Sequence, residues 1–211
     1  MEVNRKDFER FSIKLENRMN DMVENVNVKF KKLDDKAVIP TYAHDGDVGA
    51  DMTAIAVEYD ELNDLYVYHT GLAIETAKSL GMLLYPRSSN RKTDCYLPNS
   101  VGIVDSAIYR GEIIFCYKPR ISTYERSNLI AIKAYMKALS QGKTFSEAEL
   151  DFEQAKNNVY EMTKNLEFAP YKVGDRIGQM VLMKRLQIKP IETDKLSDSD
   201  RGTNGFGSSG N

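Results

Sequence analysis

Short β-type runs separated by turn residues occupy the chain from residue 27 to residue 119, and this pattern limits the fold more than any other feature. The runs at 65–68, 82–85 and 113–117 are short apolar runs that contain β-branched or aromatic residues. Gly, Pro, Asp and Asn separate the runs, as expected for turns between strands. A later run at 176–183 has the same character. Many short strands joined by turns predict a β sandwich or a jelly roll.

Two other segments have helical periodicity. In residues 1–26, apolar residues recur at steps of three and four, which predicts an amphipathic helix. Its polar face carries charges of both signs, so packing on the protein's own body or on a sister subunit is favoured over a membrane surface. Residues 121–168 predict two helices broken at Gly142, and we expect the second to begin with a capping box formed by Ser146 and Glu149.

These segments divide the chain into four parts. An N-terminal helix (1–26) precedes a β domain formed by residues 27–120 and 169–192. A helical hairpin (121–168) interrupts that domain, and a linker with a glycine-rich arm (193–211) follows it. The hairpin helices carry apolar faces that need burial against the β domain, a sister subunit or another protein. On the first helix, the residues that can share such a face are Tyr124, Leu129, Ile132, Tyr135, Met136 and Leu139.

The composition limits the class of the protein, its partners and its expected location in the cell. The 211 residues are 42% hydrophobic and 28% charged, which is typical of one soluble domain with a sizeable core. The net charge of −2 provides no basic field for nucleic acid. Cys95 and Cys116 do not have the close spacing of cysteines that bind a metal. We expect both to be reduced thiols. With no apolar signal core and no run approaching ~18 apolar residues, we expect a cytoplasmic protein that does not bind membranes.

The residues from 201 onward have the composition of an anion-binding arm. Arg201 offers a planar fork for phosphate, several glycines allow backbone N–H groups to turn toward an oxyanion, and Ser208 and Ser209 add hydroxyl donors. Phe206 provides a flat face on which a nucleobase can stack. Taken alone, the same composition also fits a flexible solvated tail.

Further segments that can carry chemistry precede this arm in a fixed order. They are Gly49-Ala50-Asp51, Pro86-Arg87-Ser88-Ser89, residues 99–105 with Tyr109-Arg110-Gly111-Glu112, and residues 174–179. Together with the arm, these segments resemble the five motifs of the homotrimeric dUTPase family over residues 27–211, apart from the helical segment. The resemblance implies a mainly β fold, a dUTPase-like jelly roll, with the helical hairpin inserted between motifs three and four.

The resemblance also implies a reaction, the hydrolysis of dUTP to dUMP and pyrophosphate. Water attacks the α-phosphorus in line, and Asp105 is the base that holds this water. From the residues alone, Asp105 could equally be a turn-capping aspartate. By resemblance, the uracil is read by Asn99 and by the backbone of Gly102, Ile103 and Val104.

The sugar-binding position departs from the family pattern. Tyr109 corresponds to a tyrosine that packs under the deoxyribose and excludes a 2′-hydroxyl. The family usually has two residues between the catalytic aspartate and this tyrosine, whereas Ser106, Ala107 and Ile108 intervene here. We expect a β-bulge to absorb the extra residue; otherwise Ile108 would take the place of Tyr109.

The remaining implied contacts concern the triphosphate and its metal. Mg²⁺ would accompany the nucleotide, and Asp51 would touch it through water. His44, Asp45 and Asp47 resemble a metal cluster only superficially, because their glycine-broken spacing favours a turn. His69 is expected on the surface of a strand. The implied substrate-binding residues are Arg87, Ser88, Ser89, Gln179, Arg201, Phe206, Gly207, Ser208 and Ser209.

Two other functions stay open at this point. The related dCTP deaminases, including bifunctional forms, share the fold but use a glutamate on the cytosine ring. A nucleotide-sensing regulatory protein that docks a partner through residues 121–168 belongs to a different class. For the hypothesis of dUTP hydrolysis, the resemblance implies a homotrimer with dUTP sites at the subunit junctions.

Overall fold

The computed structural model describes residues 10, 25–200 and 202–203. The helix expected at 1–26 lies almost entirely outside the described residues. So do the arm residues Arg201, Phe206, Gly207, Ser208 and Ser209. Their expected roles stay predictions.

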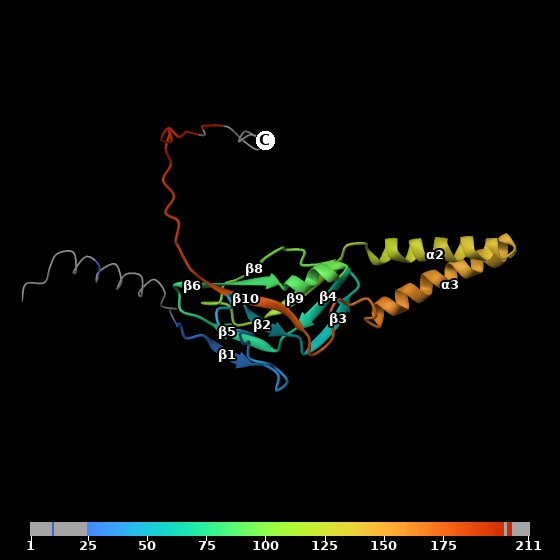
Figure 1. The fold of residues 1–211 in the computed structure, drawn as a ribbon, viewed down its shortest axis with the longest axis horizontal. Helices are drawn as coiled ribbons and strands as arrows, with labels where there is room; N and C mark the ends of the chain where they lie inside the picture. Colours follow the sequence, from blue (N-terminus) through green and yellow to red (C-terminus); the bar gives the residue numbers. More distant parts are fainter. Residues whose placement is uncertain (1–9, 11–24, 201, 204–211) are drawn as a thin grey trace, which may run out of the picture.

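Ten strands form the described body of the protein, and one short 3-10 helix joins them (Figure 1). All the strands expected from the sequence are present, which confirms a mainly β fold. The bounds are β1 (Lys29–Lys32), β2 (Ala50–Thr53), β3 (Ala56–Asp60), β4 (Leu65–His69), β5 (Leu72–Glu75), β6 (Leu80–Pro86), η1 (Ser88–Lys92), β7 (Cys95–Tyr96), β8 (Gly102–Val104), β9 (Ile114–Pro119) and β10 (Arg176–Lys184).

The strands form two four-stranded sheets and one two-stranded ribbon. One sheet has the order β2-β10-β6-β8, the other has the order β3-β4-β9-β7, and β1 pairs with β5. Every pairing between these strands is antiparallel. Strand β10 lies between β2 and β6, although more than 80 residues separate it from either, so the site depends on long-range pairing.

The two sheets pack face to face over an aromatic core. Phe115 and Tyr117 of β9 lie against β10, where Gly178 leaves room for the Phe115 ring. A Cβ at Gly178 would come within 2.1 Å of Phe115 Cε1, so only glycine fits this crossing. The Tyr117 hydroxyl donates to the Ile177 carbonyl. Burial raises the pKa of Tyr117, so the phenol remains a donor.

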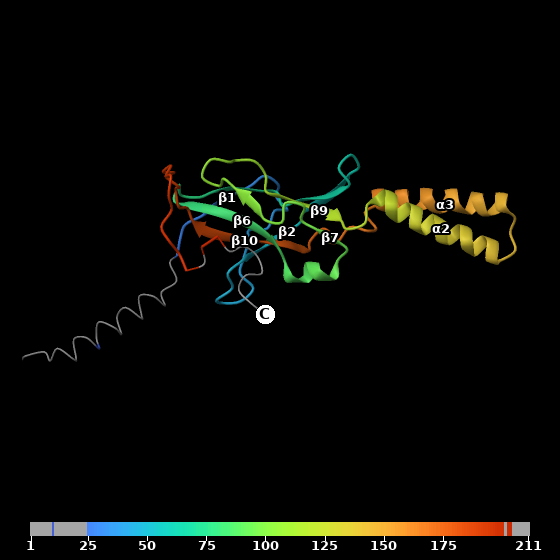
Figure 2. The same ribbon diagram turned by 90° about the horizontal axis from the view of Figure 1, so that it is seen from above.

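Two helices, α2 (Thr123–Ser140) and α3 (Phe145–Lys164), lie side by side and project from one end of the sandwich (Figures 1 and 2). Both begin with capping boxes, Ser122 with Glu125 and Thr144 with Glu147. The capping box expected at Ser146 and Glu149 is therefore wrong. Thr144 is extended and accepts from the Glu147 N–H, so the helix starts two residues earlier, with Ser146 already inside its first turn.

The contact between the helices uses small residues. On α2 the buried residues are Ser127, Ala131 and Ala138, whereas Leu129, Ile132 and Met136 from the expected apolar face are exposed. Small side chains allow two helix backbones to approach closely, so the large residues remain outside the contact. None of the described residues covers this outer side of α2.

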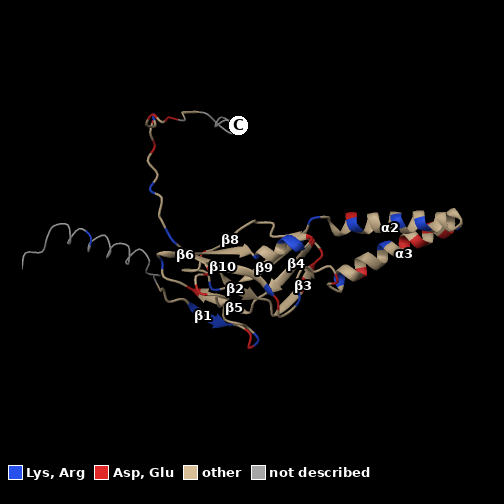
Figure 3. Ribbon diagram, viewed as in Figure 1, with Lys and Arg blue, Asp and Glu red and all other residues tan. Residues whose placement is uncertain are grey.

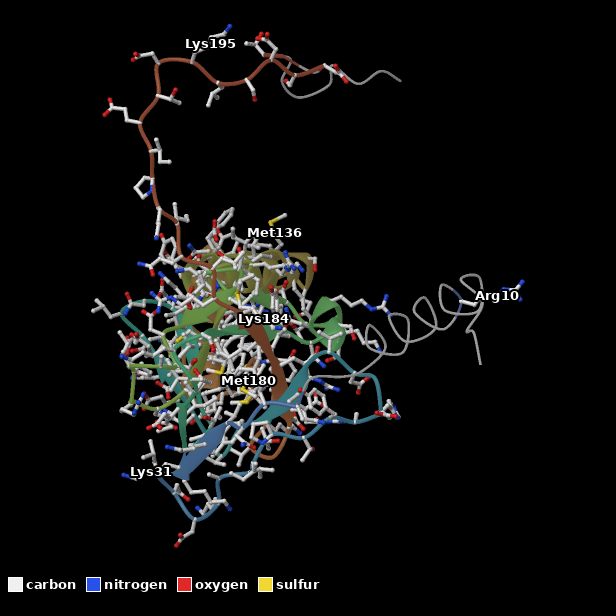
Figure 4. All side chains as sticks on the ribbon, turned by 90° about the vertical axis from the view of Figure 1, so that its left-hand side faces the viewer. Arg10, Lys31, Met136, Met180, Lys184 and Lys195 are labelled. Atoms are coloured by element: carbon white, nitrogen blue, oxygen red, sulfur yellow. The ribbon has the colours of Figure 1, made fainter. Side chains whose placement is uncertain are left out.

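Beyond β10 the chain leaves the sandwich as an extended linker, visible around Lys195 in Figure 4. Charges of both signs are spread over the sandwich, while α2 carries mainly basic and α3 mainly acidic residues (Figure 3). None of the described helices combines the length and the apolar composition that crossing a bilayer requires.

Candidate active site

Five residues predicted to bind the nucleoside and the predicted base, Asp105, line one pocket. It has a volume of about 300 Å³ and lies where β8 and the following turn approach the start of β9. Gly102 is buried against Leu84 of β6, and a Cβ at Gly102 would lie 3.1 Å from Leu84 Cβ. A side chain at position 102 would therefore crowd Leu84, which also lines the pocket. The six residues are Asn99, Gly102, Ile103, Val104, Asp105 and Tyr109.

The segment from Asp105 to Tyr109 is a turn, so the expected β-bulge is wrong. The Asp105 carbonyl accepts hydrogen bonds from the N–H groups of Ile108 at 2.9 Å and Tyr109 at 2.8 Å. A turn outside the sheet absorbs an extra residue without reversing the facing of a strand. Ser106 anchors it, since its hydroxyl is buried and lies 2.7 Å from Thr76 Oγ1. No sequence pattern indicated this role for Ser106.

The same turn separates Tyr109 from Ile108. Tyr109 lines the pocket with Asp105, whereas Ile108 is 76% exposed and lines a different hollow beside β6. The Tyr109 ring lies over Gly111, where a Cβ would come within 2.2 Å of the phenolic oxygen. Tyr109, and not Ile108, therefore faces the pocket, and its packing on the sugar stays a prediction.

A second group of predicted residues meets at Asp51, which is only 7% exposed. Arg87 Nε donates to Asp51 Oδ1 at 3.0 Å, and Gln179 Nε2 lies 3.4 Å from the same oxygen. Arg176 Nη1 donates to Asp51 Oδ2 at 2.9 Å. One buried carboxylate thus orders two guanidinium groups, which bind phosphate well.

Arg176 was missing from the predicted site, and a β-bulge explains why. In a regular strand, residues three apart face opposite ways, so Arg176 and Gln179 would be separated. Here the register with β2 shifts between Arg176 and Gly178, which places Arg176 opposite Thr53 and Gln179 opposite Asp51. Thr53 and Asp51 share one face, so both side chains reach the same carboxylate.

The two predicted serines differ in their surroundings. Ser88 begins η1 and is exposed. The Ser89 hydroxyl is buried, close to the Tyr171 hydroxyl, yet no described group forms a hydrogen bond of ordinary geometry with it. A buried hydroxyl in this state has donor and acceptor capacity to spare.

Within the described residues, the Asp51 cluster and the nucleoside pocket are formed by different residues. Asp51, Arg87, Arg176 and Gln179 do not line the pocket. The pocket takes residues from both faces of the sheet, since Gly102 is in register with Leu84 and Ile103 with Leu83. The predicted nucleoside and phosphate residues therefore form two separate groups in the described chain.

Two other predictions concerned possible metal ligands. His44 and Asp47 form a hydrogen-bonded turn around Gly46, as expected, with His44 N–H donating to Asp47 Oδ2 at 2.8 Å. Within the described part of the chain, no cluster of three or more His, Cys, Asp or Glu side chains could hold a metal ion. His69 does end strand β4, but it is hydrogen-bonded to Glu112 and only partly exposed, which the sequence did not indicate.

A two-sheet β sandwich with a nucleoside-sized pocket and paired arginines on a buried carboxylate defines a nucleotide-binding protein of the jelly-roll type. The family model described as dUTPase matches residues 159–210. The deoxyuridine 5′-triphosphate nucleotidohydrolase of Trichodesmium erythraeum is 30% identical over 186 residues, covering 88% of this chain and 99% of the relative. The enzyme of the same name from Clostridium acetobutylicum is also 30% identical, covering 88% and 97%. The chain belongs to the dUTPase family.

Solved structures agree on the fold. A dUTPase of Staphylococcus bacteriophage 80alpha, determined with dUpNHpp, superimposes with a TM-score of 0.55 at 20% identity, covering 87% of this chain and 98% of that one. A dUTPase from phage phi11 of S. aureus, described as coordinating a structural Mg(II) ion, gives a TM-score of 0.51 at 14% identity, with coverage of 82% and 99%.

Proposed function

We propose that the protein is a dUTP diphosphatase that hydrolyses dUTP to dUMP and pyrophosphate. The observation that carries the proposal is the pocket that Asp105 shares with Asn99, Gly102 and Tyr109. The pocket is large enough for a nucleoside, and the Asp105 carboxylate in its lining can hold a water molecule. Family membership and relatives named deoxyuridine 5′-triphosphate nucleotidohydrolase support the same conclusion.

In this mechanism Asp105 accepts a proton from the water that attacks the α-phosphorus in line. Asn99 and the β8 backbone read the uracil edge, and their close approach leaves no room for a 5-methyl group. Cytosine is rejected because its reversed donor and acceptor pattern would leave buried polar groups unpaired. Tyr109 packs on the deoxyribose and excludes a ribose 2′-hydroxyl.

The triphosphate is bound by the residues gathered at Asp51. Arg87, Arg176 and Gln179 face the anion, Ser88 and Ser89 contribute hydroxyls, and the arm residues Arg201 and Ser208 with Ser209 close over the distal phosphates. Mg²⁺ would neutralise charge on the triphosphate. Both Asp51 oxygens already accept from side chains, so this carboxylate fits contact with the hydrated ion through water and not direct ligation.

The complete site would form between copies of the chain in a cytoplasmic homotrimer. No described residue of the Asp51 cluster lines the nucleoside pocket, so a second copy can supply the part of the site that the first lacks. The linker after β10 carries apolar side chains, such as Ile188 at 86% exposure, that are uncovered in a single chain. Burying them against a neighbour would also bring the arm to that neighbour's site.

One parallel assay tests the reaction. Pyrophosphate release is measured with Mg²⁺ from dUTP, dCTP, dTTP and UTP, and turnover is expected to be far faster for dUTP than for the other three. Ammonia release from dCTP would identify a deaminase and overturn the proposal. Binding of dUTP without turnover would favour the nucleotide-sensing alternative.

A regulatory role at the hairpin is the second candidate, favoured by the exposed side of α2. Leu129, Ile132 and Met136 lie uncovered on a projecting element that contains none of the site residues. Such an apolar strip can bind another protein. The test is solution mass and partner binding of the full chain compared with a chain that lacks residues 121–168.

A further inference from the structure

Glu112 connects two loops behind the nucleoside pocket. Its Oε2 lies 2.9 Å from His69 Nδ1, and its Oε1 accepts from the Gly71 N–H at 2.7 Å. Both carboxylate oxygens are thus engaged by the segment that joins β4 to β5. Main-chain bonds reinforce the connection, since the Ile113 N–H donates to the Leu72 carbonyl at 2.8 Å.

The same residue faces the pocket and contacts its sugar-packing side chain. Glu112 lines the pocket together with Asp105 and Tyr109. The Tyr109 hydroxyl donates to the Glu112 carbonyl at 3.2 Å, and the Tyr109 ring lies over Gly111. The position of the tyrosine therefore depends on the backbone of residues 111–112, which the Glu112 side chain holds.

We propose that Glu112, held by His69, is a positioning residue that fixes Tyr109 in the nucleoside pocket and so sets the discrimination between deoxyribose and ribose. The inference rests on the proposed dUTP hydrolysis and on the role of Tyr109 in excluding the 2′-hydroxyl. It concerns two residues that do not touch the reacting atoms.

The charges around His69 support this arrangement. Glu112 faces Nδ1 from the turn before β9, and Glu58 of β3 lies 3.7 Å from Nε2 with its side chain 70% exposed. The hydrogen bond to Glu112 raises the pKa of His69, and the smaller influence of Glu58 acts in the same direction. The charged form of the donor is therefore favoured to a higher pH than in an exposed histidine.

The test compares Glu112→Ala, His69→Ala and His69→Asn with the wild type, using the ratio of kcat/KM for dUTP to that for UTP. Both alanine variants should lower this ratio by about tenfold, mainly through a higher KM for dUTP, because an interaction with a charged acceptor is lost. His69→Asn keeps an N–H donor near the Nδ1 position and should recover most of the ratio.

The pH profile gives a readout that simple loss of structure would not produce. Ionisations common to both substrates cancel in the ratio. In the wild type the ratio of kcat/KM for dUTP to that for UTP should decrease as the pH rises through the folded pKa of His69. The reason is that the His69 ring, which donates to Glu112, then loses its positive charge. In His69→Asn it should stay flat over the same range.

Glu58→Gln is the matched control, since it changes the other carboxylate near His69 but not the contact toward the pocket. It should keep the wild-type ratio. If an alanine variant fails to fold, Tyr109→Phe removes only the hydroxyl that reaches Glu112 and should lower the ratio in the same direction. Calorimetric binding of dUMP and UMP adds a readout independent of turnover.

The failure of the proposed function and the failure of the positioning role would give different results. A wild-type protein without dUTP turnover would overturn the proposed function. Active Glu112→Ala and His69→Ala enzymes with wild-type discrimination and wild-type dUMP binding would overturn the positioning role and leave the proposed function intact.

Discussion

The β sandwich and the helical hairpin hold together in different ways. Large aromatic side chains from distant strands fill the sandwich core, including Tyr68, Phe115 and Tyr117. The hairpin buries mainly small residues, among which Val159 is the largest. Its helices are neighbours in sequence and begin with local capping boxes. The sandwich therefore depends on long-range packing, whereas the hairpin is built from local interactions.

The joint between these regions is a small set of polar contacts at the hairpin base. Asp64 in the turn after β3 accepts from the Tyr59 hydroxyl at 2.7 Å and from the Thr123 hydroxyl at 2.8 Å. Arg126 Nη2 donates to Asp94 Oδ2 at 2.8 Å, and Tyr160 donates to Glu61. None of these residues lines the nucleoside pocket or contacts Asp51. The chemistry is thus expected to stay with the sandwich when the hairpin changes.

The largest expected effect is on turnover within the sandwich. Asp105→Asn should reduce kcat by at least ~10²-fold while dUTP binding is largely retained, because the amide keeps the shape but cannot accept the proton. Steady-state kinetics and calorimetry with dUTP check this. Near-normal turnover would remove Asp105 from the role of base.

Removing residues 201–211 should also lower the rate much more than the free energy of unfolding, since the arm is proposed to close over bound nucleotide. Phe206→Ala should act in the same direction but more mildly, because stacking on a base is worth about 1–3 kcal/mol. Kinetics and urea unfolding are measured on the same samples. Unchanged activity after truncation would show that the arm is a solvated tail without a role in catalysis.

Packing in the sandwich should be sensitive to one added methyl group. Gly178→Ala places a Cβ 2.1 Å from Phe115 Cε1, and overpacking of this kind costs about 1–3 kcal/mol of unfolding free energy. Gly81→Ala in β6 is the matched control, since its Cβ would meet only Met183 Cγ at 3.5 Å. Equal urea midpoints for the two variants would contradict the close crossing.

The hairpin should respond to the loss of its cap without a change in catalysis. Thr144→Ala is expected to lower the stability of the hairpin by about 1 kcal/mol, because the Glu147 N–H loses its acceptor. Ser146→Ala should have little effect, since Ser146 lies inside the helix. Thermal melting followed by circular dichroism distinguishes them, and a larger effect of Ser146→Ala would reverse the capping assignment.

Removing the whole hairpin is the largest change to the chain, and we expect it to have the smallest effect on activity. Replacing residues 121–168 by a short turn should leave a trimer that still hydrolyses dUTP, because none of the five motifs lies there. Solution mass and steady-state activity of the shortened chain decide the question. An inactive monomer would show that the hairpin belongs to the subunit interface or shapes the site.

Much of the fold and of the site followed from the sequence, because the signals are local. Short apolar and aromatic runs between turn residues located β4, β6, β9 and β10, and helical periodicity located α2 and α3. The ordered motifs supplied Asp51, Arg87, Gln179 and the residues of the nucleoside pocket. Short strands such as β7 and β8 gave no separate signal, because two or three residues are too few for a period.

What only the tertiary structure decided involves residues distant in sequence or a shift of one position. The bulge at Ile177 turns Arg176 toward Asp51, and a turn in place of a bulge keeps Tyr109 in the pocket. His69 meets Glu112 across 43 residues. Strand facing reverses with each residue, so one insertion or bulge exchanges the inside and the outside of a sheet. The sequence by itself thus determined which residue types are present, and the packed sheets determined which of them face one another.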